Sequence, residues 1–216
     1  NKPRIGGPAI DTFDKNWYRW IDRFINEIDH NLIGFVSWHK YGDWRDLGKW
    51  NASDKIDGYI NHIFEVSKEY ELWSKKINNL LKDKNIMNVC GEINVNSDHN
   101  PDVSRKFNQT SIASTFYISV LLHLIKGNAD IAMWWTASDK DGPYGMIDCK
   151  GNVSPVYHAK KFISNYFKCE SEINFLQTHD NKLLIALSKN AAIIINYHNK
   201  YKEIDLNEYG IKNNLF

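Results

Sequence analysis

One acidic residue follows an otherwise apolar stretch of the chain. Residues 86–96 read IMNVCGEINVN, and Glu92 stands between Gly91 and Ile93, where the apolar run ends. A buried carboxylate without a partner is costly, so such a residue is usually paired, solvated at a strand end, or used in chemistry. What Glu92 does therefore depends on the residues that the fold brings near it.

Polar and aromatic residues follow the other predicted strands in the same way. Because the carboxyl ends of parallel strands meet at one edge of a sheet, we expect these residues to form one site. Indole and phenol rings suit flat, amphipathic ligands such as sugars. The candidates besides Glu92 are His39, Tyr41, Asn94, Trp134 and Trp135. Trp134 and Trp135 are consecutive, so on a strand they point to opposite faces, and one of them must pack against helices.

The elements that position these residues alternate along the chain. Apolar residues at helical spacing predict helices over residues 14–29, 53–81, 110–126 and 155–167. A short apolar stretch precedes each helix, at residues 5–9, 32–38, 86–92 and 130–138. Four strand–helix units in succession predict a parallel sheet with helices outside it.

The pattern changes after about residue 169. Short β-rich runs lie at residues 173–177, 183–187, 192–197 and 201–206, separated by polar residues. This is typical of an antiparallel meander rather than of further strand–helix units. We therefore divide the chain into residues 1–168, with the four strand–helix units, and residues 169–216, with antiparallel β-structure.

Composition excludes several classes of protein. The 216 residues are 43% hydrophobic and 25% charged with a formal net charge of +1, so we expect neither nucleic acid nor a membrane as partner. The three cysteines have no metal-binding spacing, and we expect no metal, no cofactor and no disulfide framework. No signal peptide opens the sequence, so the default expectation for its location is cytoplasmic.

Four stretches carry a resemblance to a known family. IGGPA, FVSWHKYG, GEIN and WWTASD…GPYGMIDCKGNVSPVYHA resemble, in order and spacing, the second half of clan A glycoside hydrolases, most closely family 39, the β-xylosidase and α-L-iduronidase family. The resemblance covers about residues 4–167. It implies an α/β fold that is half of a (β/α)8 TIM barrel, strands five to eight, followed by the start of an accessory β-domain.

The resemblance also implies roles for the candidate residues. Glu92 matches the family's catalytic nucleophile at the end of strand seven. His39 and Tyr41 match sugar-contacting positions, and Trp134 and Trp135 match an aromatic platform. The family usually has threonine before and tryptophan after its nucleophile, where this chain has Gly91 and Ile93.

The family's general acid/base has no counterpart here. It is a glutamate in an Asn-Glu pair on strand four, whereas Asn26-Glu27 lies within a predicted helix and Asn207-Glu208 lies near the C-terminus. Without acid assistance the rate should fall by roughly 10²–10⁴-fold. Asp139 and Asp148 are the only nearby acids that could substitute. Otherwise the acid comes from a partner chain, from a missing N-terminal half, or has been lost.

Two functions follow as expectations. The first is a glycoside hydrolase that acts on a β-xyloside-like or related glycan, with Glu92 as nucleophile. The second is a non-catalytic carbohydrate-binding or vestigial half-barrel. Four parallel strands expose two edges and one apolar face, so we expect a homodimer or a second chain that completes the barrel.

Overall fold

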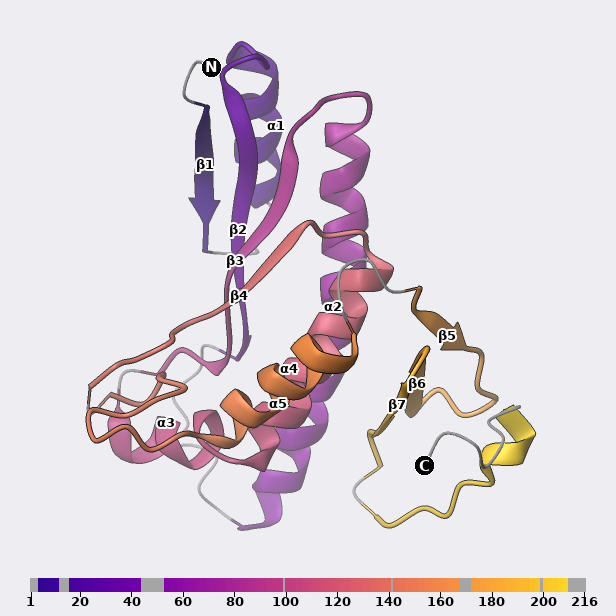
Figure 1. Ribbon diagram of the computed structural model, residues 1–216. Helices are drawn as coiled ribbons and strands as arrows, with labels where there is room; N and C mark the ends of the chain where they lie inside the picture. Colours follow the sequence, from indigo (N-terminus) through magenta and orange to yellow (C-terminus); the bar gives the residue numbers. More distant parts are fainter. Residues whose placement is uncertain are drawn as a thin grey trace.

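The computed structural model describes residues 4–11, 16–43, 53–98, 100–140, 142–167, 172–198 and 200–209. It shows a mixed α/β fold with two sheets (Figure 1). The elements are, in chain order, β1 (Ile5–Ile10), α1 (Trp17–Glu27), β2 (Ile33–Asp43), α2 (Ser53–Leu81), β3 (Met87–Asn96), α3 (Pro101–Asn108), α4 (Ser111–Lys126), β4 (Ile131–Trp134), α5 (Pro155–Tyr166), β5 (Asn174–Leu176), β6 (Leu183–Ser188), β7 (Ala191–Asn196) and the 3₁₀ helix η2 (Leu206–Tyr209).

The larger sheet has the strand order β1-β2-β3-β4, and every neighbouring pair is parallel. The smaller sheet, β5-β6-β7, is antiparallel. The prediction of strand–helix alternation followed by an antiparallel meander is therefore confirmed at the level of the two sheets. The boundary predicted between residues 168 and 169 falls outside the described residues.

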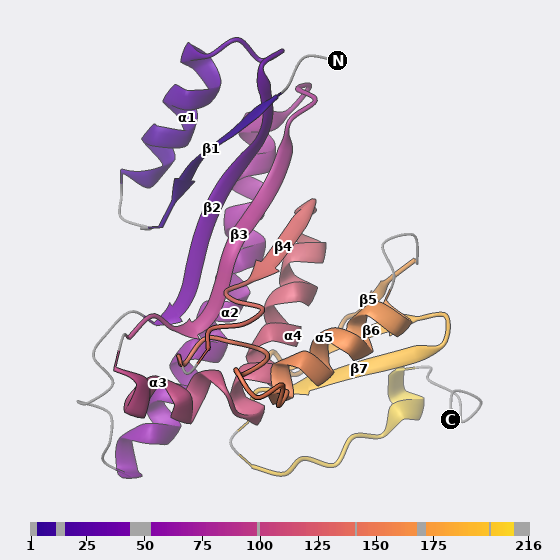
Figure 2. The same ribbon diagram turned by 60° about the vertical axis from the view of Figure 1, so that its left-hand side comes forward.

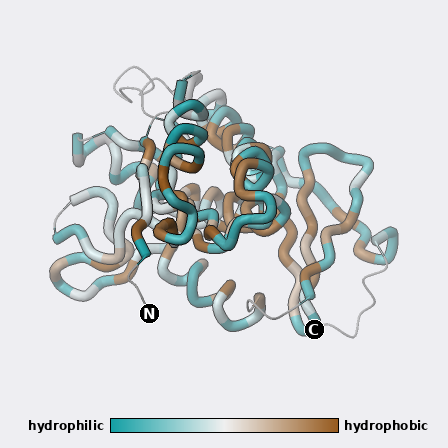
Figure 3. Tube along the Cα trace, turned by 90° about the horizontal axis from the view of Figure 1, so that it is seen from above, coloured by the Kyte–Doolittle hydropathy of each residue, from teal (hydrophilic) through white to brown (hydrophobic). Residues whose placement is uncertain are grey.

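The core lies between the larger sheet and its helices. Helices α2 and α4 lie behind β2 to β4 in Figure 2. Trp38 on β2 is fully buried there, and its ring lies 5.9 Å from that of Tyr70 on α2. In Figure 3 the hydrophobic segments gather in the middle of the molecule, where helices and strands meet. Burial of alternate strand residues against amphipathic helices is what holds the sheet.

Close packing of α2 and α4 depends on a small residue at the end of α4. A Cβ atom on Gly127 would lie 2.6 Å from the Cβ of Ser74 and 3.1 Å from the carbonyl oxygen of Glu71. The Ser74 hydroxyl donates to the Gly127 carbonyl at 2.9 Å. The φ of Gly127 is −85°, so this glycine serves close approach rather than a left-handed conformation.

Two strands are longer than the sequence predicted. β2 continues to Asp43 and β3 to Asn96, so His39, Tyr41 and Glu92 lie within strands rather than after them. The polar residues continue the parallel pairing, with His39 opposite Glu92 and Tyr41 opposite Asn94. The apolar residues alone predict strands that are too short, because the polar residues that continue β2 and β3 pair with each other across the sheet.

Two short segments also differ from the prediction. Residues 101–108 form α3 rather than a loop, because the Asn100 side chain accepts from the backbone of Asp102 and Pro101 occupies the first turn. The run at residues 201–206 forms no strand. It leads instead into η2, where the Asp205 carboxylate accepts from the backbone of Asn207 at 2.9 Å.

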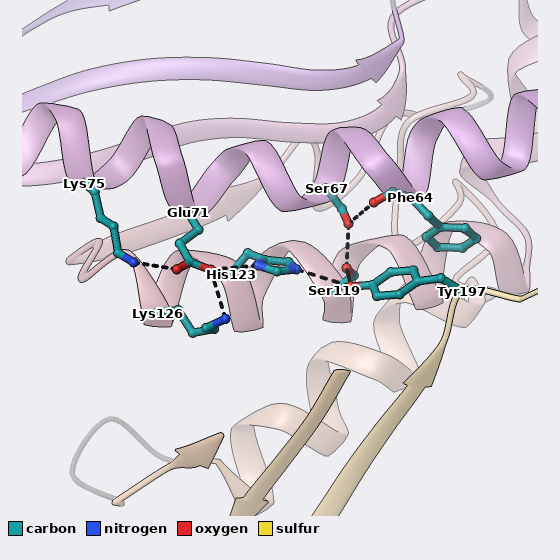
Figure 4. Close-up of polar contacts among 8 residues, drawn as sticks. All are labelled: Phe64, Ser67, Glu71, Lys75, Ser119, His123, Lys126 and Tyr197. Carbon is teal, nitrogen blue, oxygen red and sulfur yellow. Dashed lines mark hydrogen bonds and ion pairs between the residues drawn. The ribbon is translucent and has the colours of Figure 1, made fainter. Parts of the chain in front are cut away.

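The smaller sheet is joined to α2 and α4 by a buried polar network (Figure 4). The Tyr197 hydroxyl, just after β7, lies 2.7 Å from Ser119 Oγ and 3.3 Å from His123 Nε2 on α4. His123 Nδ1 lies 3.2 Å from Glu71 on α2. Because a carboxylate only accepts, Nδ1 carries a hydrogen there. Apolar residues of the smaller sheet, such as Ile195, belong to the same core cluster.

Candidate active site

The carboxylate of Glu92 is held by two side chains from the neighbouring strand. The Tyr41 hydroxyl donates to Glu92 Oε2 at 2.7 Å, and His39 Nδ1 lies 3.4 Å from Oε1. The side chains of Glu92 and His39 are 22% and 16% exposed. Both oxygens of Glu92 therefore have a partner, and the group is still reachable from solvent.

A bulge in β3 places this carboxylate. The pairing passes from Trp38 opposite Cys90 to His39 opposite Glu92, so Gly91 is an extra residue. A Cβ atom on Gly91 would lie 2.7 Å from Ser37 Oγ and 3.2 Å from His39 Nε2. Only glycine therefore lets the ring of His39 approach the backbone beside Glu92.

The electrostatics of the group keep Tyr41 as a hydrogen-bond donor. Burial raises the pKa of Tyr41, and the hydrogen bond and charge of Glu92 raise it further. The phenol therefore stays protonated at any physiological pH and donates to the carboxylate. Cys90 lies beside this pair and donates from Sγ to the Glu92 carbonyl at 3.9 Å. Burial raises the pKa of Cys90, so it remains a thiol and is a poor nucleophile.

The structure separates the two tryptophans. Trp134 is 7% exposed, packs edge-on against Tyr117 of α4 with ring centroids 5.1 Å apart, and donates from Nε1 to the Tyr144 carbonyl at 3.2 Å. Trp135 is 46% exposed. The prediction that one of the pair packs against helices is confirmed for Trp134, and Trp135 is the ring that a ligand can reach.

Asn94 lies below the surface. It is fully buried, its Nδ2 donates to the Trp135 carbonyl at 2.5 Å, and its Oδ1 accepts from the backbone of Val95 at 2.7 Å. Both ends of the amide are engaged within the protein. Asn94 therefore ties β3 to the segment that carries Trp135, and a ligand would have to displace these bonds to contact it.

The prediction from sequence missed Tyr144, in the loop after β4. Its hydroxyl donates to the Asp98 carbonyl at 2.8 Å. Tyr144 also contributes, after burial and Glu92, to the raised pKa of Tyr41. Burial, followed by the charges of Asp98 and Asp139, raises the pKa of Tyr144 to about 12. The available signal was the stretch GPYG, in which glycines flank a single aromatic residue.

The carboxylates of the two loop acids, Asp139 and Asp148, accept hydrogen bonds from the backbone of their own loop. Asp139 Oδ2 accepts from the backbone of Tyr144 at 3.1 Å, within its own loop. Asp148 is exposed and accepts from the backbones of Lys150 and Asn152, each at 2.8 Å. The hydrogen bond from the Asn152 side chain lowers the pKa of Asp148, so this carboxyl is ionised at neutral pH.

Other kinds of site find no support in the described part of the chain. It contains no group of three or more His, Cys, Asp or Glu side chains placed to hold a metal ion. No described helix has the length and apolarity that a membrane span requires. Trp44 and Trp50, which precede α2, lie outside the described residues.

The group thus offers an accepting carboxylate, a phenol donor and an imidazole within the carboxyl-terminal halves of β2 and β3, and an exposed indole just after β4. Comparison of the chain with protein-family models and with curated protein sequences found no match in either case.

Proposed function

We propose that this chain carries the nucleophile half of a glycoside hydrolase site that acts on a β-xyloside-like glycan, with Glu92 as nucleophile. The observation that supports it best is the paired contact of Tyr41 and His39 with the two oxygens of Glu92. A structural ion pair would not need a carboxylate that is also open to solvent on the sheet face.

The chemistry assigns a role to each group. Glu92 attacks the anomeric carbon, and the bond to the leaving oxygen breaks as the glycosyl ester forms. Tyr41 orients the carboxylate by donating to Oε2, while His39 and the exposed ring of Trp135 contact hydroxyls and the face of the sugar. Water then releases the sugar from Glu92 and completes the hydrolysis.

We propose that the acid that protonates the leaving oxygen comes from another polypeptide segment. In support, the carboxylates of Asp139 and Asp148 accept hydrogen bonds from the backbone of their own loop. We propose that the four parallel strands are one half of a (β/α)8 barrel, and that the segment closing the barrel supplies the second carboxyl group. The pair is needed because both retaining and inverting hydrolysis use two.

A second candidate function is carbohydrate binding without catalysis. The observation in its favour is that both acids of the loop after β4, Asp139 and Asp148, already accept hydrogen bonds from the backbone of that loop. In this alternative Trp135 and His39 bind the sugar, and Glu92 accepts hydrogen bonds from its hydroxyls.

Hydrolysis of an aryl β-xyloside with a good leaving group separates the two candidates, because such a substrate needs little acid assistance. We expect the purified chain to release the phenol and Glu92→Gln to lose that activity while retaining xyloside binding. Glu65→Gln is the matched control, since Glu65 is an exposed residue of α2 that pairs with Lys68 one turn away. Equal rates for Glu92→Gln and the unaltered chain would contradict the proposal.

A further inference from the structure

The larger sheet has one face that its own helices leave open. Met87, Ile131 and Met133 lie on this face and are between 38% and 45% exposed. Their neighbours in sequence point the other way: Asn88 bonds to Ser74 of α2, and Trp134 packs on Tyr117 of α4. Parallel sheets are normally covered on both faces, so three large apolar side chains here indicate a surface that another structure covers.

The two outer edges of the same sheet are also open. Within the described residues the strand order ends at β1 on one side and at β4 on the other, and neither outer edge has a paired strand. Ile5 on β1 is 51% exposed. An unpaired parallel edge offers a row of backbone donors and acceptors to a further strand.

The helices at the two ends of the helix layer expose aromatic rings. α1 contacts β1, α2 packs between α1 and α4, and α5 packs on the far side of α4. The exposed rings are Tyr18 and Trp20 on α1, and Phe162 and Tyr166 on α5. Aromatic rings are enriched at protein interfaces. The surface therefore continues from the sheet face across both edges to the outermost helices.

We propose that a second copy of this chain covers the open face. The chain's own sheet offers three matching features: an apolar face, two parallel edges without a described neighbouring strand, and exposed rings on the helices at both ends. A twofold axis along the strands puts β4 of each copy beside β1 of its partner, with the directions still parallel. The result is eight parallel strands closed on themselves with the helices outside.

This arrangement also completes the site, and that part of the inference rests on the proposed function. Glu92 of each copy faces the interior from opposite sides, so the second copy supplies the second carboxyl group. The two lie on diametrically opposite strands, a separation wider than the 5–5.5 Å of a retaining pair. In this dimer one Glu92 takes a proton from an attacking water and the other protonates the leaving oxygen, so the anomeric carbon is inverted and no glycosyl ester forms. Direct attack by Glu92, as described above, belongs to a site whose acid comes from a closer segment.

Light scattering on a sizing column tests the inference directly. We expect a mass of twice 25.2 kDa for the unaltered chain. Met133→Lys puts a charge on the open face and should leave a monomer at the same concentration. Leu72→Lys is the matched control, because Leu72 is 61% exposed but lies on α2, and it should leave the dimer intact.

Other outcomes separate this inference from the proposed function. A monomeric unaltered chain, or a Met133→Lys variant that still dimerises, overturns the inference. If Met133→Lys fails to give a cooperative unfolding transition, Phe162→Lys on α5 takes its place with the same expected loss of the dimer. A dimer that binds but does not hydrolyse xylosides confirms the interface and contradicts the proposed function alone.

Discussion

Tyr41 and Glu92 face each other across β2 and β3, and the Tyr41 hydroxyl donates to Glu92 Oε2 at 2.7 Å. The bond joins two positions separated by 51 residues in sequence. The bulge at Gly91 brings Glu92 opposite His39. Tyr41 lies two residues further along β2, so its hydroxyl can reach the Glu92 carboxylate.

Removing this donor should lower activity more than stability. In Tyr41→Phe the carboxylate loses a charge-assisted hydrogen bond worth about 1.5–3 kcal/mol, which corresponds to roughly 10- to 100-fold in kcat/KM on an aryl xyloside. Steady-state kinetics measure this effect, and a urea titration of the same variant reports its stability. Unchanged kcat/KM would mean that Tyr41 does not orient a reacting group.

A side chain at position 91 should lower the stability of the protein. Gly91→Ala brings a methyl group to 2.7 Å from Ser37 Oγ, so we expect the free energy of unfolding to fall by about 1–3 kcal/mol and His39 to be displaced. Gly58→Ala is the control, because nothing lies within 4 Å of its added Cβ on α2. That variant should gain about 0.5–1 kcal/mol in urea denaturation. Equal effects of the two substitutions would exclude the crowding at Gly91.

The adjacent tryptophans should respond in opposite ways. Trp134→Ala removes a buried ring that packs on Tyr117, and we expect a loss of about 3–5 kcal/mol in stability. Trp135→Ala removes an exposed ring and should weaken xyloside binding with little effect on the unfolding midpoint. Calorimetric titration and urea denaturation of both variants measure this contrast. If Trp135→Ala lost stability and Trp134→Ala did not, Trp135 would be the packed ring and Trp134 the ring that contacts a ligand.

The network between α2, α4 and β7 should make stability depend on pH. Burial lowers the pKa of His123, although the hydrogen bond from its ring to Glu71 opposes this. A histidine with a lower pKa in the folded state contributes stability above its unfolded pKa of about 6.5, and this contribution is lost as the pH falls below that value. Burial raises the pKa of Glu71, but hydrogen bonds from Lys75, His123 and Lys126 outweigh it and bring the pKa to about 2.

His123 and Glu71 therefore affect the stability of the protein in different pH ranges. The contribution of Glu71 is present above about pH 4.5 and is lost only as the pH falls toward 2. We expect the urea midpoint to fall between about pH 7 and pH 5, and His123→Gln to remove this step. Hydrogen exchange of β7 amides should show the same step, because Tyr197 follows β7 and lies against His123. An identical pH profile in His123→Gln would assign the step to another group.

The order and type of most elements could be predicted from the amino-acid pattern. Apolar residues at helical spacing form α2, α4 and α5, and a short apolar run precedes each helix. This pattern predicts parallel strands with helices outside, because only that arrangement buries the apolar strands and the apolar helix faces together. The same alternation required that Trp134 and Trp135 face opposite ways. It also marked Glu92 as a carboxylate that needs a partner.

Which residues contact each other became known only from the folded arrangement of the chain. The continuation of β2 and β3 through polar residues depends on pairing between distant segments, so the apolar pattern ended them too early. Which tryptophan is buried was set by Tyr117 on α4, and the burial of Asn94 by the Trp135 carbonyl. These contacts join residues from 17 to 41 positions apart, and local periodicity carries no information about such separations.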